Sequence, residues 1–375
     1  MIVKLGDIAR ECKCTSDNKE CPIVGLEHLE PKELLLKNYS TDPNTTFTKA
    51  FKAGQILFGR RRSYQQKASV ATFDGICSGD ITVIEAIPGK VEPRLLPFII
   101  QNEAFFNYSI IGSAGGLSPR VKWQHLANYE FDLPSLDEQK VLADKLWAAY
   151  EVKESYKNLL AQTDKLLHAQ FEKMFGDETN TPHEKLEKLC NTFIDGDWIE
   201  SKDQSTEGVR LIQTGNVGNG EYLDKLDKAH YITESTFDRL HCTEIFAGDI
   251  LISRLPDPIG RACILPDGLE KAITAVDCTI IRLKEERILP KFFIAATNST
   301  AYQDKVRSFI TGTTRARISR GNLATIEIPV PSIEKQKEFV TVAEQAEQTK
   351  ASLNKGVETI EAVIRSLIAE GTTKV

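Results

Sequence analysis

The feature of this sequence that most constrains its fold is an eight-residue segment that occurs twice. Residues 133–140 read LPSLDEQK, and residues 330–337 read VPSIEKQK, 197 positions further along the chain. In each copy a proline and a serine precede a long stretch with apolar side chains at helical spacing. An internal repeat of this kind determines the whole architecture, because each copy supplies one structural unit.

Three further pairs of segments keep the same order as the first pair. Matched features in one order are expected from a duplicated unit and not from chance similarity. They are AGQIL at 53–57 and AGDIL at 247–251, DITVI at 80–84 and DCTII at 277–281, and the glycine-containing loops at 112–120 and 312–317.

Two long helices are expected after the Pro-Ser segments. In the first, Ser135 can cap the helix, Glu138 completes a capping box and Gly176 can end it. The second lacks the capping box, and Gly356 weakens its middle. Because an isolated amphipathic helix leaves its apolar seam in water, the two seams are expected to pack on each other. The first seam contains Leu142, Leu146, Ala149, Tyr156, Leu160, Thr163, Leu167, Phe171 and Met174.

The remaining sequence has short runs of β-forming residues separated by glycine and proline, with short helical pieces such as residues 290–303. We therefore predict an α+β fold with two mixed α/β globules, separated by two long helices packed as an antiparallel coiled coil. The fold is expected to have an internal pseudo-twofold repeat. The predicted segments are a first globule at 1–134, a first helix at 135–176, a second globule at 177–331 and a second helix at 332–371.

Composition indicates a cytoplasmic protein. The sequence has no run of about 18 apolar residues that could span a membrane, and MIVKLGDIAREC at the start does not resemble a signal peptide. The eight cysteines are scattered, so reduced thiols are expected. Cys12, Cys14, Cys21 and His28 cluster, but their spacing matches no standard zinc finger, and whether they bind metal is left open.

Charge is distributed unevenly along the chain. The net charge of −6 argues against a nucleic-acid partner, because binding to phosphates needs clustered Lys and Arg. Residues 250–331, however, carry 12 basic and 8 acidic side chains. Local fields steer a polyanion more than the total charge does, so a nucleic-acid partner stays possible.

The sequence lacks the common catalytic motifs. It has no phosphate-binding GxxxxGK[ST] loop, no HExxH zinc helix, no GxSxG nucleophile elbow and no Asn-Pro-Pro-aromatic segment. Glu200-Ser201-Lys202, with Asp195 and Asp197 nearby, could form part of a nuclease site. Such triplets are common by chance in a chain with 27% charged residues. No catalytic residue is therefore assigned.

The duplicated motifs resemble those of the specificity subunits of type I restriction-modification systems. The resemblance is carried by LPSLDEQK and VPSIEKQK at the helix starts, by the AGQIL and AGDIL segments, and by VRLIQTGNV at 209–217. It covers essentially the whole chain. It implies that each globule is a target recognition domain that reads one half of a split DNA sequence.

The resemblance also implies partners. The paired helices would form a spacer and dock two methyltransferase subunits, and restriction would additionally need motor-nuclease subunits. Double-stranded DNA is the implied ligand, and no membrane is involved. No cofactor is expected on this chain, because S-adenosylmethionine, ATP and Mg²⁺ would be bound by the partner subunits.

Candidate DNA-binding residues are basic side chains near the glycine-containing loops and polar side chains that can read base edges. Consecutive arginines after a probable strand and a loop that lets the backbone approach phosphate favour DNA. The alternative for any single arginine is a solvated surface position. In the first half the candidates are Arg60, Arg61, Arg62, Tyr64, Lys67, Ser113, Arg120 and Lys122; in the second they are Gln213, Thr214, Asn216, Arg254, Arg261, Thr313, Thr314, Arg315, Arg317 and Arg320.

The geometry of such a chain predicts a bipartite, asymmetric target with an unread gap. With antiparallel helices of about 60 Å, the two globules would lie roughly 34 Å apart, one turn of DNA. Two other functions fit the same sequence. One is the recognition part of a type IIB-like system, and the other is a coiled-coil scaffold that binds only proteins, which the net charge favours.

Overall fold

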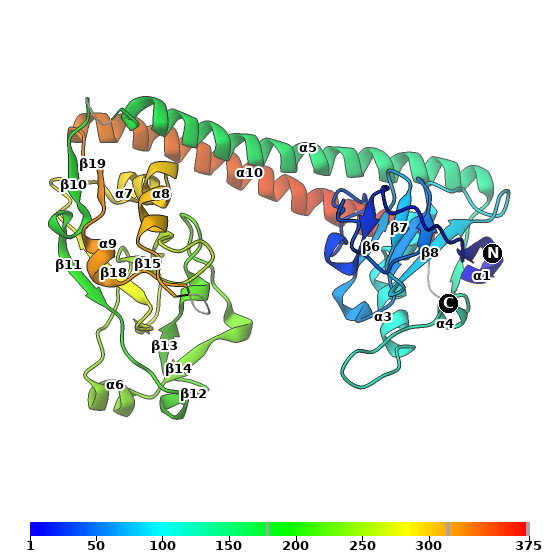
Figure 1. Ribbon diagram of the computed structural model, residues 1–375, viewed down its shortest axis with the longest axis horizontal. Coiled ribbons are helices and arrows are strands. Elements are labelled where there is room, and N and C mark those ends of the chain that lie inside the picture. The colour runs from blue at the N-terminus through cyan, green and yellow to red at the C-terminus, as the bar shows by residue number, and fades with distance from the viewer. Residues whose placement is uncertain (178–179, 313–315, 373–375) are drawn as a thin grey trace. The chain divides into compact units, whose positions relative to one another are not determined.

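The computed structural model describes residues 1–177, 180–312 and 316–372 as a mixed α/β protein (Figure 1). The chain divides into two compact units. Unit 1 comprises Met1–Asn158 and Leu353–Val375, and unit 2 comprises Leu159–Ser352. This division differs from the four segments expected from the sequence, because each long helix contributes residues to both units.

Unit 1 is built around a four-stranded antiparallel sheet with the order β2-β8-β5-β6. A three-stranded sheet, β3-β7-β4, and the pair β1-β9 complete it. Phe58, Phe105, Phe106 and Tyr129 are fully or almost fully buried in its main core. The elements are β1 (Ile2–Lys4), α1 (Leu5–Ile8), β2 (Ala9–Cys12), β3 (Ile23–Val24), β4 (Lys49–Phe51), β5 (Ile56–Gly59), β6 (Ala68–Val70), β7 (Gly75–Cys77), β8 (Ile81–Ala86), α2 (Leu96–Ile100), α3 (Glu103–Ile111), α4 (Trp123–Leu126) and β9 (Glu130–Asp132).

Unit 2 has a corresponding four-stranded antiparallel sheet, β11-β18-β15-β16. It adds the sheet β12-β14-β13-β17 and the pair β10-β19. The elements are β10 (His183–Lys185), β11 (Cys190–Asp195), β12 (Gln204–Ser205), β13 (Val209–Ile212), β14 (His230–Ile232), α6 (Glu234–Leu240), β15 (Ile250–Ser253), β16 (Ala262–Ile264), β17 (Ala272–Thr274), β18 (Cys278–Leu283), α7 (Pro290–Thr297), α8 (Thr300–Ser308), α9 (Arg320–Ala324) and β19 (Glu327–Pro329).

The AGQIL and AGDIL segments form the same turn before β5 and β15. Gly54 has φ +86 and Gly248 has φ +87, a left-handed conformation that favours glycine. The next side chain closes each turn: Gln55 Oε1 accepts from a backbone N–H at 2.8 Å, and Asp249 Oδ2 does so at 3.0 Å. The repeated letters therefore encode a repeated backbone conformation.

The helical piece expected at 290–303 is two helices, α7 and α8. The helical prediction is confirmed, but the stretch is divided because Ser299 caps a new helix: its Oγ accepts from the Tyr302 backbone N–H at 3.3 Å. Pro290 begins α7, where its missing N–H costs nothing.

The two long helices are α5 (Leu136–Phe175) and α10 (Ile333–Gly371). In unit 1, Gly356 of α10 lies against the Tyr156 ring of α5, where an added Cβ would meet the ring at 2.7 Å. In unit 2, Phe171 of α5 and Phe339 of α10 have ring centroids 5.2 Å apart. Gly356, which weakens the helix intrinsically, is therefore needed for a close contact. Among the described residues, no helix is long and apolar enough to cross a membrane.

The glutamine of each Pro-Ser segment fastens its helix to its own unit. Gln139 is 2% exposed; its side chain donates to the Pro134 carbonyl and accepts from the Glu92 N–H, both at 2.8 Å. Gln336 is 0% exposed and makes the same two kinds of contact, with Pro331 and Leu289, at 2.9 Å. It also donates to the carbonyl of Arg287 at 2.9 Å. The shared glutamine of LPSLDEQK and VPSIEKQK thus forms a buried set of hydrogen bonds between the helix start and its unit, which we call the glutamine joint.

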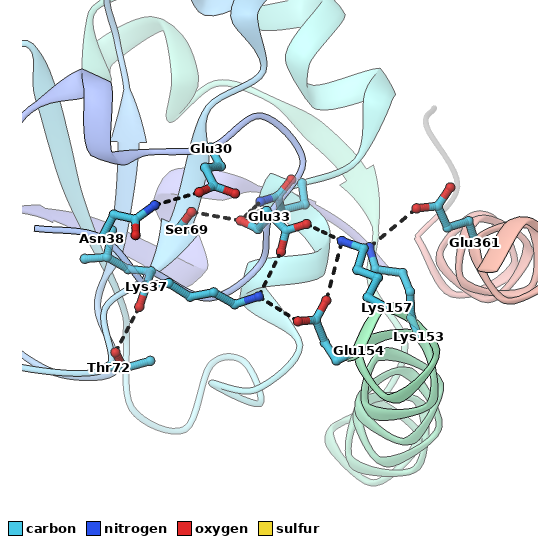
Figure 2. Close-up of polar contacts among 12 residues, drawn as sticks. Glu30, Glu33, Lys37, Asn38, Ser69, Thr72, Lys153, Glu154, Lys157 and Glu361 are labelled. Atoms are coloured by element: carbon cyan, nitrogen blue, oxygen red, sulfur yellow. Dashed lines mark hydrogen bonds and ion pairs between the residues drawn. The ribbon is translucent and has the colours of Figure 1, made fainter. Parts of the chain in front are cut away.

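An ion-pair network binds the first part of α5, which belongs to unit 1, to the rest of that unit (Figure 2). Lys37 contacts Glu154 of α5 at 2.7 Å and Glu33 at 3.5 Å, while Lys157 of α5 also contacts Glu33 and Glu154. Burial would raise the pKa of Glu154, but the hydrogen bond from Lys37 and the charges of both lysines hold it below its ordinary value. Partly buried charges in such a network are screened less by salt than exposed ones.

Candidate nucleic-acid interface

In unit 1, the loop between α3 and α4 is joined to the end of β5 by backbone hydrogen bonds. The Arg60 N–H donates to the Asp80 carbonyl at 3.0 Å, and the Arg60 carbonyl accepts from Val121 at 2.9 Å. Ala114 and Arg120 pair across the base of the loop, which extends away from the sheets (Figure 1). This framework brings two groups of predicted DNA-binding residues together, Arg60 to Arg62 and Arg120.

A single carboxylate lies between two of these arginines. Asp80 Oδ1 accepts from Arg120 Nε at 2.7 Å, and Oδ2 lies 3.3 Å from Arg120 Nη2 and 3.4 Å from Arg61 Nη1. Arg61 Nε donates to Ser118 Oγ at 2.5 Å. The hydrogen bond from Arg120, followed by the charges of both arginines, lowers the pKa of Asp80, so the carboxylate is ionised at neutral pH.

The other candidates in unit 1 differ in how freely they face solvent. Arg62 and Lys122 are exposed, and Tyr64 is 55% exposed. Lys67 donates to the carbonyl of Leu26 at 2.7 Å, so its charge is turned toward the protein. Ser113 forms hydrogen bonds with Ser63 Oγ and with the carbonyl of Ser109. Lys67 and Ser113 therefore support the loop framework.

Unit 2 has the same backbone framework with different side chains. The Arg254 N–H donates to the Asp277 carbonyl at 2.9 Å, and the Arg254 carbonyl accepts from Ile318 at 3.3 Å. Thr311 and Arg317 pair as Ala114 and Arg120 do in unit 1. The candidates Thr313, Thr314 and Arg315 lie outside the described residues.

The carboxylate that contacts arginines in unit 2 comes from another strand. Asp195, at the end of β11, lies 3.4 Å from Arg254 Nη2 and 3.9 Å from Arg320 Nε. Arg317 and Arg320 are exposed, but Arg254 is only 4% exposed. Similar backbones therefore present differently arranged cations in the two units.

Three predicted DNA contacts in unit 2 are buried, which corrects the sequence-based expectation. Arg261 is 6% exposed, and it donates to four backbone carbonyls at 2.6–2.8 Å. Arg254 donates to the carbonyl of Val276 at 2.6 Å. Asn216 is 8% exposed, and its amide group bonds the backbone of Gln213 and Leu223. These side chains organise the loops from inside, because they are buried and most of their hydrogen-bonding groups already bond backbone atoms.

Gln213 and Thr214 are half-buried beside this framework. The Thr214 carbonyl accepts from Arg261, which fixes the 3-10 turn Thr214–Asn216. Their own side chains remain candidates for contact with DNA, as do the exposed cations Arg317 and Arg320 of the same unit.

The family model for the type I restriction modification DNA specificity domain matches residues 183–362. The second half of this chain therefore belongs to the type I restriction-modification specificity family. The matched region runs from β10 into α10, and it therefore includes the whole sheet system of unit 2 and much of the second long helix. The resemblance inferred from the duplicated segments is confirmed.

Relatives of this specificity chain agree with the assignment. The type I restriction enzyme EcoDI specificity subunit of Escherichia coli is 25% identical over 182 residues. The aligned region is 47% of this chain and 40% of the EcoDI subunit, so it spans less than half of either protein. A solved structure on complex assembly and conformational transition of the type I R-M system aligns over 99% of this chain and 97% of its own, with TM-score 0.58 and 16% identity. The type I S subunit from M. genitalium aligns over 98% and 94%, with TM-score 0.53 and 13% identity. At these identities the two structures show a shared fold.

Exposed apolar residues of the specificity chain escaped the sequence-based prediction. Leu117, at the tip of the α3–α4 loop, is 98% exposed, and Gly115 beside it has φ +117. In unit 2, Trp198 is 71% exposed. The glycines of this loop gave a sequence signal, but the single leucine that follows them gives none, because an apolar residue is mostly interpreted as part of the core.

The possible metal ligands Cys12, Cys14, Cys21 and His28 do not form one site in the specificity chain. Cys12, Cys14 and Cys21 line one cavity of about 360 Å³, with Cys12 Sγ 3.2 Å from Cys14 Sγ. His28 instead accepts from the backbone of Gly25. In the part of the chain that the structure describes, no three His, Cys, Asp or Glu side chains are placed to hold a metal ion.

The suggested nuclease carboxylates of the specificity chain also have separate partners. Glu200 pairs with Lys202 at 2.8 Å, and Asp197 accepts from the Thr243 N–H at 2.9 Å. Burial raises the pKa of Asp197. Asp195 contacts arginines, as described above.

Proposed function

We propose that this chain is the sequence-specific DNA-binding specificity subunit of a type I restriction-modification complex and that it reads a bipartite, asymmetric site. One observation carries the proposal. The same backbone framework joins a strand end to a loop in each unit, yet the side chains on the two frameworks differ. A backbone that is repeated with different polar groups is suited to reading two different base sequences.

The contacts that we assign to DNA follow from exposure. Phosphates would be met by exposed cations, and bases by side chains that the framework holds in place. We retain Arg60, Arg61, Arg62, Tyr64, Arg120 and Lys122 in unit 1 and Gln213, Thr214, Arg317 and Arg320 in unit 2, and we add Leu117 as an apolar contact in the groove.

We further propose that the two units are copies of one duplicated module and that α5 and α10 form an antiparallel coiled coil that spaces the half-sites. Matched sheet orders, matched glycine turns and matched glutamine joints support the duplication. In unit 1, Gly356 lies against Tyr156 and Gly371 against Leu142, which supports opposite chain directions for the two helix segments. In unit 2, the contacts of Phe339 with Phe171 and of Lys350 with Asp164 support the same arrangement.

The long helices also offer a surface for the methyltransferase subunits, with motor-nuclease subunits joining the assembly for restriction. Several of their apolar side chains are exposed, including Val141 at 54%, Val152 at 41% and Leu166 at 70%. These side chains are available for contact with a protein partner. S-adenosylmethionine, ATP and Mg²⁺ would act on those subunits, and this chain would select the site without catalysis.

The proposal is tested by co-expressing the chain with its methyltransferase partner and mapping methylated positions across a genome. The expected result is a motif with two different half-sites separated by a gap of unread bases. Replacing residues 177–331 by those of another specificity chain should change one half-site only. A single continuous motif would refute the bipartite reading. No methylation and no salt-dependent DNA binding would favour the protein-only scaffold.

A further inference from the structure

Asp80 is unexpected at a surface that is proposed to meet a polyanion. A carboxylate repels phosphate, and its side chain is 21% exposed next to cations of the proposed contact surface. The fold fixes the position of Asp80, because this residue directly precedes β8 and its backbone carbonyl accepts from the Arg60 N–H. A surface selected only for attraction to DNA would have no acid at this position.

The contacts of Asp80 leave part of each guanidinium group available. Arg120 uses Nε and Nη2 on the carboxylate, and Arg61 uses Nη1 on Asp80 and Nε on Ser118. Among the described residues, Arg120 Nη1 and Arg61 Nη2 have no hydrogen-bond acceptor. Because two contacts fix each guanidinium plane, the remaining N–H groups point in defined directions.

We propose that Asp80 is a positioning residue that orients Arg61 and Arg120 for directed contacts with base edges, so that it lowers general attraction to DNA and raises discrimination between sequences. Recognition of guanine by arginine requires two N–H groups in fixed geometry, and a flexible arginine loses side-chain entropy on binding. A carboxylate that already orders the arginines removes most of that loss. The proposal rests on the proposed DNA-binding function.

Unit 2 also contains an acid that contacts arginines at its backbone framework. Asp195 contacts Arg254 and Arg320, although it comes from β11 and not from the turn before β18. An acid that supports arginines at the corresponding framework therefore occurs in both units, from two different chain positions. Duplication of a single ancestral acid does not explain this recurrence, because the two acids lie at different positions in their units.

The test uses the complete complex of this chain with its methyltransferase subunits. Equilibrium binding is measured for the cognate duplex and for an unrelated duplex, each at two salt concentrations, with wild type and Asp80→Asn. We expect the affinity of the variant for unrelated DNA to rise a few-fold, because one repelling charge is removed. Its ratio of cognate to unrelated affinity should fall at least about tenfold, as expected when a directed base contact is lost.

Asp17→Asn is the matched control, because Asp17 is an exposed carboxylate elsewhere in unit 1 and its removal changes net charge equally. This control should leave the ratio unchanged. Arg120→Lys is the second variant: it keeps the charge but cannot make the two-point contact with Asp80. It should lower the ratio without strengthening binding to unrelated DNA, and it keeps the test decisive if Asp80→Asn does not fold.

The outcomes separate the two proposals. If Asp80→Asn raises both affinities by the same factor, or if Arg120→Lys keeps the wild-type ratio, Asp80 does not position the arginines and the inference is overturned. If the wild-type complex itself shows no salt-dependent binding to any duplex, the proposed function fails instead.

Discussion

Replacing Gln336 by leucine should destabilise unit 2 far more than its conservative size suggests. The side chain is fully buried and makes three hydrogen bonds: from the Leu289 N–H, and to the carbonyls of Arg287 and Pro331. Leucine fills a similar volume but leaves three buried polar groups without a partner. At about 1 kcal/mol for each buried hydrogen bond lost, the free energy of unfolding should fall by roughly 3 kcal/mol.

This loss corresponds to a decrease of about 6–12 °C in the unfolding midpoint of a unit of this size. Differential scanning calorimetry of the full chain measures it, and amide hydrogen exchange locates it, since the Leu289 N–H should lose protection. Gln345→Leu is the control, because Gln345 is an exposed glutamine on the same helix. If both variants unfold at the same temperature, the buried joint does not stabilise the helix start and the reasoning is refuted.

Three further predictions follow from contacts described above. Gly356→Ala should lower the stability of unit 1 by about 1 kcal/mol in thermal unfolding, because a clash with the Tyr156 ring outweighs the gain in helix propensity. Gly321→Ala is the control: Gly321 has open space around it, so this substitution should be neutral or stabilising. Since the pKa of Glu154 is lowered in the folded state, its contribution to stability is present above the ordinary value of 4.5 and is lost as pH falls through the lowered pKa. Glu154→Gln should therefore reduce the acid-side slope in a plot of unfolding midpoint against pH, and an unchanged slope would contradict this prediction. Leu117→Ala should weaken cognate DNA binding by the complex about tenfold without changing its salt dependence, because an apolar contact of roughly 1.4 kcal/mol is lost; a changed salt slope would argue against an apolar role.

The long helices could be predicted because their signals are local. Ser135 and Glu138 form the predicted capping contacts, with the Glu138 carboxylate accepting from the Ser135 N–H at 2.9 Å. The apolar spacing also located the seam, since Leu146 and Phe171 are buried. It missed Lys153, which is 7% exposed and pairs with Glu361 at 3.5 Å, because a lysine in a seam gives no apolar signal.

The candidate site was less predictable, because an arginine near a loop has the same local sequence whether it faces solvent or the interior. Arg120 is exposed, while Arg261 is held by backbone carbonyls from distant turns. Those turns are brought together only by tertiary structure. Asp80 was recognised as part of a repeated segment, but its role beside Arg61 depends on a loop 40 residues away in sequence, at Arg120.

The division of the two long helices between the units has a consequence for biosynthesis. Unit 1 contains the first 158 residues, yet its core also includes Ile368, with Ile364 and Leu367 packed against it. A ribosome delivers all of unit 2 before it delivers these three residues. Synthesis of unit 2 is therefore finished first. The earlier-made unit 1 keeps an uncovered apolar surface until the last helical turns have been added, and aggregation or chaperone capture is most favoured in this interval.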